Sequence, residues 1–210
     1  GNFLAAINES VSKIMKTDVR TLRPDATLNE ALEIILRDRI GGIPIVDEDG
    51  VLNGIVTERD VLKILCRSHA ATPVESIMTR SLLVQQPDCP LSTVTKVMTE
   101  HQFRRLPIVK NDVLFGIITA TDIVRYIGTG RVFEKLVTGN VAEVMNIPVR
   151  DLLSGNLFTT DPDATVTDAA RAMMAKKVGA LPVIDQSRLV GLVTEFDLVR
   201  AFSPANNDRR

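Results

Sequence analysis

Residues 106–122, LPIVKNDVLFGIITATD, decide the fold, because the chain carries their pattern three times. The other copies begin at Ile43-Pro44 and Leu181-Pro182 and end at Asp60 and Asp197. In each copy an apolar strand that contains proline runs through a short polar turn into a second apolar strand, which a Thr-x-x-Asp sequence closes. The spacing predicts a hairpin followed by a helix at three places in the chain.

A longer frame surrounds each copy, with a short apolar stretch and then a helical pattern upstream of each hairpin. In the first unit, Thr27-Leu28-Asn29-Glu30 is a capping box that marks the start of the upstream helix. Pro90 takes its place in the second unit, where proline suits the first helical turn, and Thr165 with Asp168 repeats the cap in the third. Each unit is therefore predicted to run strand, helix, strand, strand, helix.

The repeats divide the chain into three units joined by connectors. The start of the chain carries a short pattern, Gly1-Asn2 with Asn8 and Val11. The same residue types recur at the same spacing within 139–149, between the second and third units. Because the later occurrence follows a unit, we expect a further unit upstream of the first occurrence, outside this chain. The predicted boundaries are 1–10 for a connector, 11–65, 74–127 and 149–202 for the units, 128–148 for a connector with a helix at 131–137, and 203–210 for a polar tail.

The composition disfavours several classes of function. A formal net charge of -1, without a run of five like charges, argues against nucleic-acid binding. Two cysteines, Cys66 and Cys89, and two histidines, His69 and His101, are too few for a disulfide framework or a zinc site. The chain also lacks the roughly eighteen consecutive apolar residues of a membrane span, so we expect a cytoplasmic protein.

The sequence also lacks the common catalytic constellations. It has no glycine-rich phosphate loop, no metal-spaced cluster and no nucleophile that the repeat would place beside a histidine. We therefore expect no enzyme activity within this chain.

The repeated pattern resembles the CBS domain, in three copies that cover nearly the whole chain. Its connector is similar to that of archaeal proteins with four CBS motifs that resemble the γ subunit of AMP-activated protein kinase. The resemblance implies an α+β fold, in which tandem CBS motifs of β-α-β-β-α type pair side by side into Bateman modules. It also implies that clefts between paired motifs bind adenosine nucleotides.

In the family, the aspartate of Thr-x-x-Asp accepts hydrogen bonds from the ribose hydroxyls, while the first strand and the residues around the proline surround the adenine. A carboxylate at a helix N-terminus suits this role, because it stays ionised and presents two oxygens to a diol. The alternative is that threonine and aspartate only cap the helix. The expected nucleotide-binding residues are Thr21, Ile43, Pro44, Thr57, Arg59, Asp60, Val84, Arg104, Arg105, Leu106, Pro107, Thr119, Thr121, Asp122, Thr159, Ala180, Leu181, Pro182, Thr194 and Asp197.

The three sites are not equivalent in sequence. Arg104-Arg105 precedes the second hairpin, where γ subunits often place phosphate-binding bases, and arginine's planar fork suits phosphate oxygens. The corresponding residues, Gly41-Gly42 and Gly179-Ala180, carry no charge. We therefore expect uneven phosphate binding, with Arg59 and Lys176-Lys177 as further cations, unless the two arginines are simply solvated surface residues.

Pairing yields a last expectation from the sequence. The second and third units, joined by the long connector, should form one module, and the first should pair with the expected upstream unit. If that unit is absent, the first leaves an apolar strand face uncovered. A homodimer, in the disc-like arrangement known for the family, would cover that face.

The sequence thus predicts a regulatory protein that binds AMP, ADP or ATP and passes its occupancy to an effector protein. No cofactor is required, and nothing in the sequence identifies the effector. One alternative is a module for S-adenosylmethionine or another adenosyl compound, with an affinity independent of Arg104 and Arg105. The other is a structural scaffold with vestigial sites.

Overall fold

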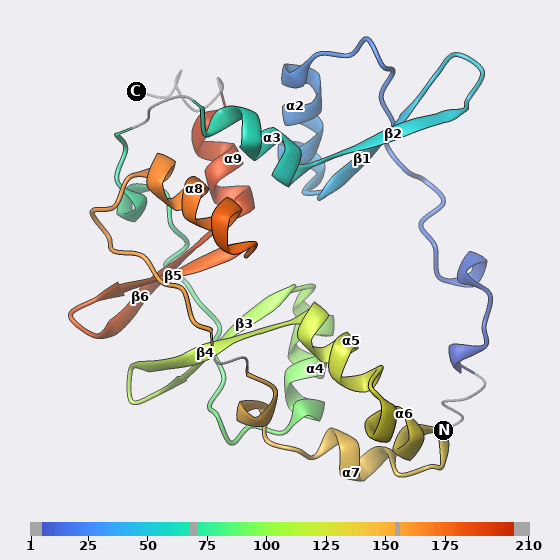
Figure 1. The fold of residues 1–210 in the computed structure, drawn as a ribbon, viewed down its shortest axis with the longest axis vertical. Helices are drawn as coiled ribbons and strands as arrows, with labels where there is room; N and C mark the ends of the chain where they lie inside the picture. The colour runs from blue at the N-terminus through green and yellow to red at the C-terminus, as the bar shows by residue number, and fades with distance from the viewer. Residues whose placement is uncertain (1–5, 68–70, 154–155, 204–210) are drawn as a thin grey trace. The chain divides into compact units, whose positions relative to one another are not determined.

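The computed structural model describes residues 6–67, 71–153 and 156–203, and it contains two compact units (Figure 1). Unit 1 comprises Gly1–Met15, Ser81–Leu157 and Gln186–Leu189, and unit 2 comprises Lys16–Arg80, Phe158–Asp185 and Val190–Arg210. The second repeat therefore forms most of unit 1, while the first and third repeats share unit 2. The Gly1-Asn2 end of the first connector, His69 and the tail beyond Ser203 lie outside the described residues.

Each repeat contains the helix, hairpin and second helix that its pattern predicts. The elements of unit 2 are α2 (Leu28–Asp38), β1 (Gly42–Val46), β2 (Leu52–Thr57), α3 (Glu58–Leu65), η2 (Val74–Ser76), α8 (Val166–Lys176), β5 (Ala180–Asp185), β6 (Arg188–Thr194) and α9 (Glu195–Phe202). Those of unit 1 are η1 (Val11–Lys13), α4 (Leu91–His101), β3 (Arg105–Lys110), β4 (Val113–Thr119), α5 (Ala120–Ile127), α6 (Gly130–Val137), α7 (Val141–Met145) and η3 (Val149–Leu152).

The hairpins form two-stranded antiparallel sheets, β1-β2, β3-β4 and β5-β6. The turn of β3-β4 has positive φ at both central residues, Asn111 (52°) and Asp112 (64°), as its tight two-residue geometry requires. The longer turn of β1-β2 is held by Asp47, whose Oδ1 accepts hydrogen bonds from the backbone N–H groups of Asp49 and Val51, each at 2.9 Å.

The predicted first strand of each repeat is shorter than expected. Only one residue of it pairs, in a parallel bridge: Leu22 with Ile45 in the first repeat, and likewise Gln85 with Ile108 and Thr160 with Val183. The bridge uses two backbone hydrogen bonds, such as Leu22 N to Pro44 O and Val46 N to Leu22 O. The proline at the third position of the hairpin strand donates no hydrogen bond, and its carbonyl accepts one from this bridge.

The helix starts match the sequence except in two details. Thr27 and Glu30 form the predicted reciprocal capping box at α2. Pro90 lies at the N-cap of α4 rather than inside its first turn, so the helix begins at Leu91. The predicted connector helix is α6, and α7 adds a second helix that the sequence pattern did not indicate.

The packing of the cores departs from the order of the sequence. Val74 and Met78 begin the second repeat in sequence, yet they are buried in the core of the third repeat with Leu181 and Val193. Val149 begins the third repeat but is buried in the core of the second. A repeat in sequence is therefore not a packing unit, because each of these two cores takes in the segment that opens the other repeat.

Candidate functional site

The threonine and aspartate of each Thr-x-x-Asp sequence form a reciprocal capping box at α3, α5 and α9. In the third repeat, the Thr194 N–H donates to Asp197 Oδ2 at 3.0 Å, and the Asp197 N–H donates to Thr194 Oγ1 at 3.1 Å. The threonine and the aspartate of each repeat therefore do cap the helix that follows. The cap uses one carboxylate oxygen of each aspartate and fixes the orientation of the other.

A second feature common to all three repeats is a backbone hydrogen bond beside this cap. The N–H of the first helical residue donates to a backbone carbonyl at the entry to the hairpin. This carbonyl belongs to the third residue before the hairpin proline. The pairs are Glu58 N with Gly41 O (3.1 Å), Ala120 N with Arg104 O (2.9 Å) and Glu195 N with Gly179 O (3.1 Å). Two backbone segments that lie 16 or 17 residues apart in sequence are thus joined at one edge of each hairpin.

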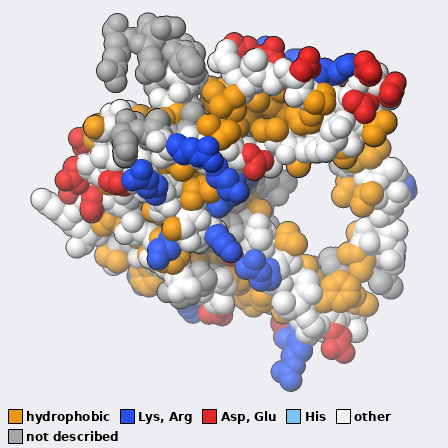
Figure 2. Space-filling model, turned by 45° about the horizontal axis from the view of Figure 1, so that its top comes forward, with side chains coloured by type: hydrophobic (Ala, Val, Ile, Leu, Met, Phe, Trp, Pro, Cys, Tyr) orange, Lys and Arg blue, Asp and Glu red, His pale blue; other side chains and the backbone are white. Residues whose placement is uncertain are grey.

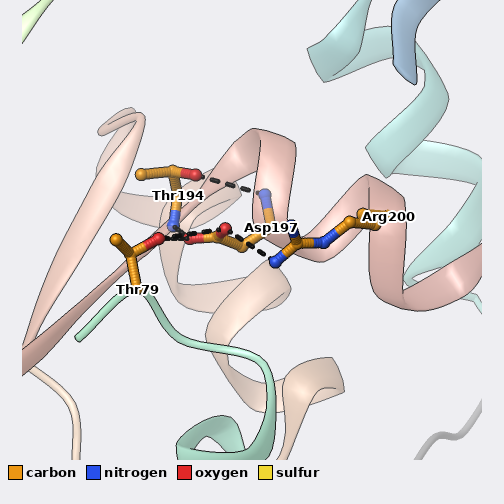
Figure 3. Close-up of polar contacts among 4 residues, drawn as sticks. All are labelled: Thr79, Thr194, Asp197 and Arg200. Carbon is orange, nitrogen blue, oxygen red and sulfur yellow. Dashed lines mark hydrogen bonds and ion pairs between the residues drawn. The ribbon is translucent and has the colours of Figure 1, made fainter. Parts of the chain in front are cut away.

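Asp197 lies at the most enclosed of the three positions, with 3% of the residue exposed. The Thr79 hydroxyl donates to its Oδ1 and Oδ2, both at 3.3 Å, and Arg200 Nη2 lies 3.4 Å from Oδ1 (Figure 3). The carboxylate therefore meets a hydroxyl donor and a cation, in addition to its own cap. A vicinal diol could replace the long Thr79 contacts with two hydroxyl donors.

Asp122 has the same cap but a more open carboxylate. Its Oδ2 accepts from the Thr119 N–H at 2.9 Å, and its Oδ1 lies 3.9 Å from Nη1 of the exposed Arg125. The Ala120–Arg104 hydrogen bond places the Arg104-Arg105 backbone against this helix start. Arg104 is exposed and Arg105 is half-buried. The Asp122 carboxylate, the Arg125 guanidinium and the Arg104 backbone thus meet at one helix N-terminus, which itself favours anions.

Arg59 has a different neighbourhood from the one expected for a phosphate ligand. Its Nη2 donates to Glu195 Oε1 and to the Val178 carbonyl, each at 3.1 Å. The contact links the first turns of α3 and α9 within unit 2. A phosphate at Arg59 would have to compete with Glu195, so this residue holds the two helix starts together in the present arrangement.

The remaining predicted residues divide by burial. Ile43, Leu106 and Leu181 are at most 1% exposed, so their side chains belong to the cores and only their backbone could meet a ligand. Thr21, Val84 and Thr159, which directly precede the bridge residues, are exposed. Of the others, Pro107, Ala180 and Pro182 are buried, Pro44 is half-buried and Thr121 is exposed on α5.

Two residues near Asp197 were absent from the prediction. Thr79 lies 118 positions before Asp197, and only the packing of its segment on the third repeat brings it there. Arg200 could have been found, because a base three residues after the aspartate recurs as Lys63, Arg125 and Arg200. At that spacing a helix places the base on the same face as the carboxylate.

Other chemistry finds little support among the described residues. They contain no group of three or more histidine, cysteine or acidic side chains that could hold a metal ion. None of the helices formed by residues 6–67, 71–153 and 156–203 is long and apolar enough to cross a membrane. Burial raises the pKa of the Cys89 thiol above its usual value, which makes this cysteine a poor nucleophile.

The tandem strand-and-helix motifs and the repeated Thr-x-x-Asp caps define the class of protein. A family model of the CBS domain matches residues 11–67, 74–129 and 149–204. The chain therefore belongs to the CBS-domain family.

Its relatives are also known. The chain is 36% identical over 204 residues to the uncharacterized protein MJ1225 of Methanocaldococcus jannaschii, covering 96% of this chain and 73% of that protein. The crystal structure of MJ1225, described as a candidate archaeal homologue of γ-AMPK, matches with a TM-score of 0.90 over the same shares. An uncharacterized 33.4 kDa protein of Thermofilum pendens is 30% identical over 199 residues, 95% of this chain and 66% of the relative.

A more distant structure shares the fold alone. CBSX2, solved in complex with AMP, is 22% identical and matches with a TM-score of 0.53 over 66% of this chain and 99% of its own. Both sequence relatives are longer than the region that this chain matches.

Proposed function

We propose that this chain is a regulatory module that binds an adenosine nucleotide at the starts of α5 and α9. The carboxylates of Asp122 and Asp197 would accept the ribose hydroxyls. The observation that carries the proposal is the backbone hydrogen bond that joins the strand entry to the capped helix start in every repeat. It gives each repeat the same edge, where a capped carboxylate lies beside the backbone that enters the hairpin. The shared fold of CBSX2, solved with AMP, supports the same reading.

The two sites should differ in what they recognise. At Asp122, the carboxylate and the arginines Arg104, Arg105 and Arg125 complement a ligand with both a diol and phosphates. At Asp197, the enclosed carboxylate already has two partners, and a diol would have to displace the Thr79 hydroxyl. We therefore assign the phosphate-dependent affinity to the Asp122 site.

The route by which occupancy could reach a partner starts from the Arg59–Glu195 ion pair. Arg59 is adjacent to Asp60 in sequence, and Glu195 lies two residues before Asp197. The pair is partly buried, with 32% of the Arg59 side chain and 18% of the Glu195 side chain exposed. A ligand that shifts the first turn of α9 would change this contact, and its effect is limited to its difference in affinity between the two arrangements.

The test is calorimetric titration with AMP, ADP, ATP, S-adenosylmethionine and adenosine, repeated on Asp122→Asn and Asp197→Asn. Asparagine keeps an oxygen for the cap but removes the charge and one acceptor, so it should cost on the order of tenfold or more in affinity. Asp168→Asn is the matched control, because Asp168 occupies the same capped position of α8, outside the proposed sites. Full binding in both site variants would refute the assignment.

A second arm separates a nucleotide site from a site for other adenosyl compounds. The double variant Arg104→Ala, Arg105→Ala should weaken ATP, ADP and AMP while leaving adenosine unchanged. A control pair, Arg171→Ala with Arg188→Ala, removes two exposed charges elsewhere on the chain. Tight S-adenosylmethionine binding that ignores the arginines would favour an adenosyl sensor, and no binding by any of the five compounds would favour a scaffold.

A further inference from the structure

The first repeat contacts the start of α9 at two consecutive residues, Glu195 and Phe196, and all of these contacts lie within unit 2. Arg59 of α3 forms an ion pair with Glu195 at 3.1 Å. The Cζ atom of Arg39 lies 4.3 Å from the centre of the Phe196 ring, which is a cation–π contact. The next residue is Asp197. The helix turn that carries this carboxylate is therefore held by side chains from another repeat.

The two contacts involve the same position of the repeat, because Arg59 and Phe196 are each the third residue of a Thr-x-x-Asp sequence. Arg59 donates to the carbonyl of Val178, which follows Lys177, the left-handed residue that ends α8. Phe196 packs against Arg39, the left-handed residue that ends α2. Each side chain thus reaches the end of the upstream helix in the other repeat, although one side chain is a cation and the other an aromatic ring.

The middle of α9 is held differently from its first turn. Leu62 of α3 is buried in the core of the third repeat, and Val199 of α9 is buried in the core of the first. These side chains fix the two helices against each other by packing. The first turn of α9 lies before Val199 and is held by its own cap and by the contacts from Arg39 and Arg59.

Arg200 connects the aromatic contact to the carboxylate. Its Nη2 lies 3.4 Å from Asp197 Oδ1, and its Cζ lies 5.8 Å from the centre of the Phe196 ring. Phe196 is therefore shared by two guanidinium groups, those of Arg39 and Arg200. A change at Arg39 reaches Asp197 by two routes, through the backbone of the helix turn and through the position of Arg200.

We propose that Arg39 and Arg59 are positioning residues for Asp197, so that the first repeat sets the ligand affinity of the third. This inference rests on the proposed function, because it concerns a carboxylate assigned there to a ribose. The apparent affinity of a site falls in proportion to the fraction of molecules that hold it in the binding arrangement. Asp122, in unit 1, has the short side chain of Thr121 at the corresponding position, so its affinity should not depend on these arginines.

The first test needs no ligand. The Asp197 N–H donates to Thr194 Oγ1 inside the cap, and its protection from hydrogen exchange reports how firmly the first turn is held. The double variant Arg39→Gln, Arg59→Gln should lower this protection by about tenfold. The Asp122 amide, which has the same cap, should keep its protection. Unchanged protection of the Asp197 amide would overturn the proposal, whatever the chain binds.

The second test measures AMP affinity by calorimetry in two backgrounds, each of which retains one proposed site. In the Asp122→Asn chain, Arg39→Gln should weaken AMP binding by about threefold or more. Arg39→Lys should restore most of the affinity, because an ammonium group is also attracted to the Phe196 ring. In the Asp197→Asn chain, Arg39→Gln should have no effect. Equal losses in the two backgrounds, or no rescue by lysine, would reduce Arg39 to a structural residue and overturn the proposal.

Other exposed basic side chains provide a control for a general effect of charge (Figure 2). Arg37→Gln removes a guanidinium group from the end of the same helix, where Arg37 pairs with the adjacent Asp38. It should change neither the exchange of the Asp197 amide nor the affinity for AMP, and an effect equal to that of Arg39→Gln would refute the positioning role. If neither background binds AMP, the proposed function fails, and the exchange of the Asp197 amide still decides whether the two arginines hold this turn.

Discussion

Three glycines, Gly54, Gly116 and Gly191, occupy the same position of the repeat. Replacing each of them with alanine should change the stability by a different amount. A Cβ at residue 191 would lie 2.5 Å from the Met78 sulfur and 3.1 Å from the Thr79 carbonyl oxygen. The sulfur can move, but the carbonyl is fixed by its bond to the Leu192 N–H. Overpacking of this kind costs about 1–3 kcal/mol.

The same change has the opposite sign at residue 54. Nothing lies within 4 Å of a Cβ there, so Gly54→Ala should gain about 0.5–1 kcal/mol from the lower entropy of the unfolded chain. Gly116→Ala should fall between the two, because its close neighbours are the mobile methyl groups of Leu153. The expected difference between residues 191 and 54 is thus about 2–3 kcal/mol.

Urea unfolding of the three variants measures this difference, at protein concentrations where the chain is a monomer. With a slope of about 2 kcal/mol per molar urea, the midpoints for residues 191 and 54 should differ by about 1 M. Hydrogen exchange of the Leu192 amide gives a local readout, since this N–H donates to Thr79 and should lose protection only in Gly191→Ala. Equal midpoints for Gly54→Ala and Gly191→Ala would refute the idea that the opening segment covers one hairpin and not the other.

Three further predictions concern other contacts. A double-mutant cycle on Arg59→Ala and Glu195→Ala should give a coupling energy of about 1 kcal/mol, measured by urea unfolding, since the pair is partly buried; a coupling near zero would remove it as the link between α3 and α9. Thr27→Ala should cost about 1 kcal/mol of stability, because it removes the hydroxyl that accepts from the Glu30 N–H and leaves only the bond from the Thr27 N–H to Glu30 Oε2, whereas Thr27→Ser should cost much less. Hydrogen bonds from the Val51 N–H, and then from Asp49, hold the pKa of Asp47 below its ordinary value. The turn should therefore keep this stabilisation above the unfolded-state pKa and lose it as the pH falls through the lower folded-state pKa, which NMR titration of the carboxyl carbon would follow; a normal pKa would contradict the turn geometry.

The sequence predicted the parts of the fold that depend on neighbouring residues. The hairpins, their turns and the Thr-x-x-Asp helix starts follow from apolar alternation, turn residues and capping pairs within a few positions of one another. The sequence could not predict that Val74 and Met78 complete the core of the third repeat. Propensity and periodicity carry no information about contacts more than a hundred residues apart. The compact units follow a different grouping from the expected one, because the first and third repeats share unit 2 and the second repeat forms most of unit 1.

The site could likewise be predicted only where its residues lie inside a repeated sequence pattern. The aspartates and the strand entries could be predicted because each lies inside a repeated pattern, and the structure joins them through a hydrogen bond in every repeat. Thr79 could not, since its contact with Asp197 depends on the exchanged segment. Arg59 was expected to face a phosphate because it lies inside Thr-x-x-Asp, but its long side chain reaches Glu195 of another repeat.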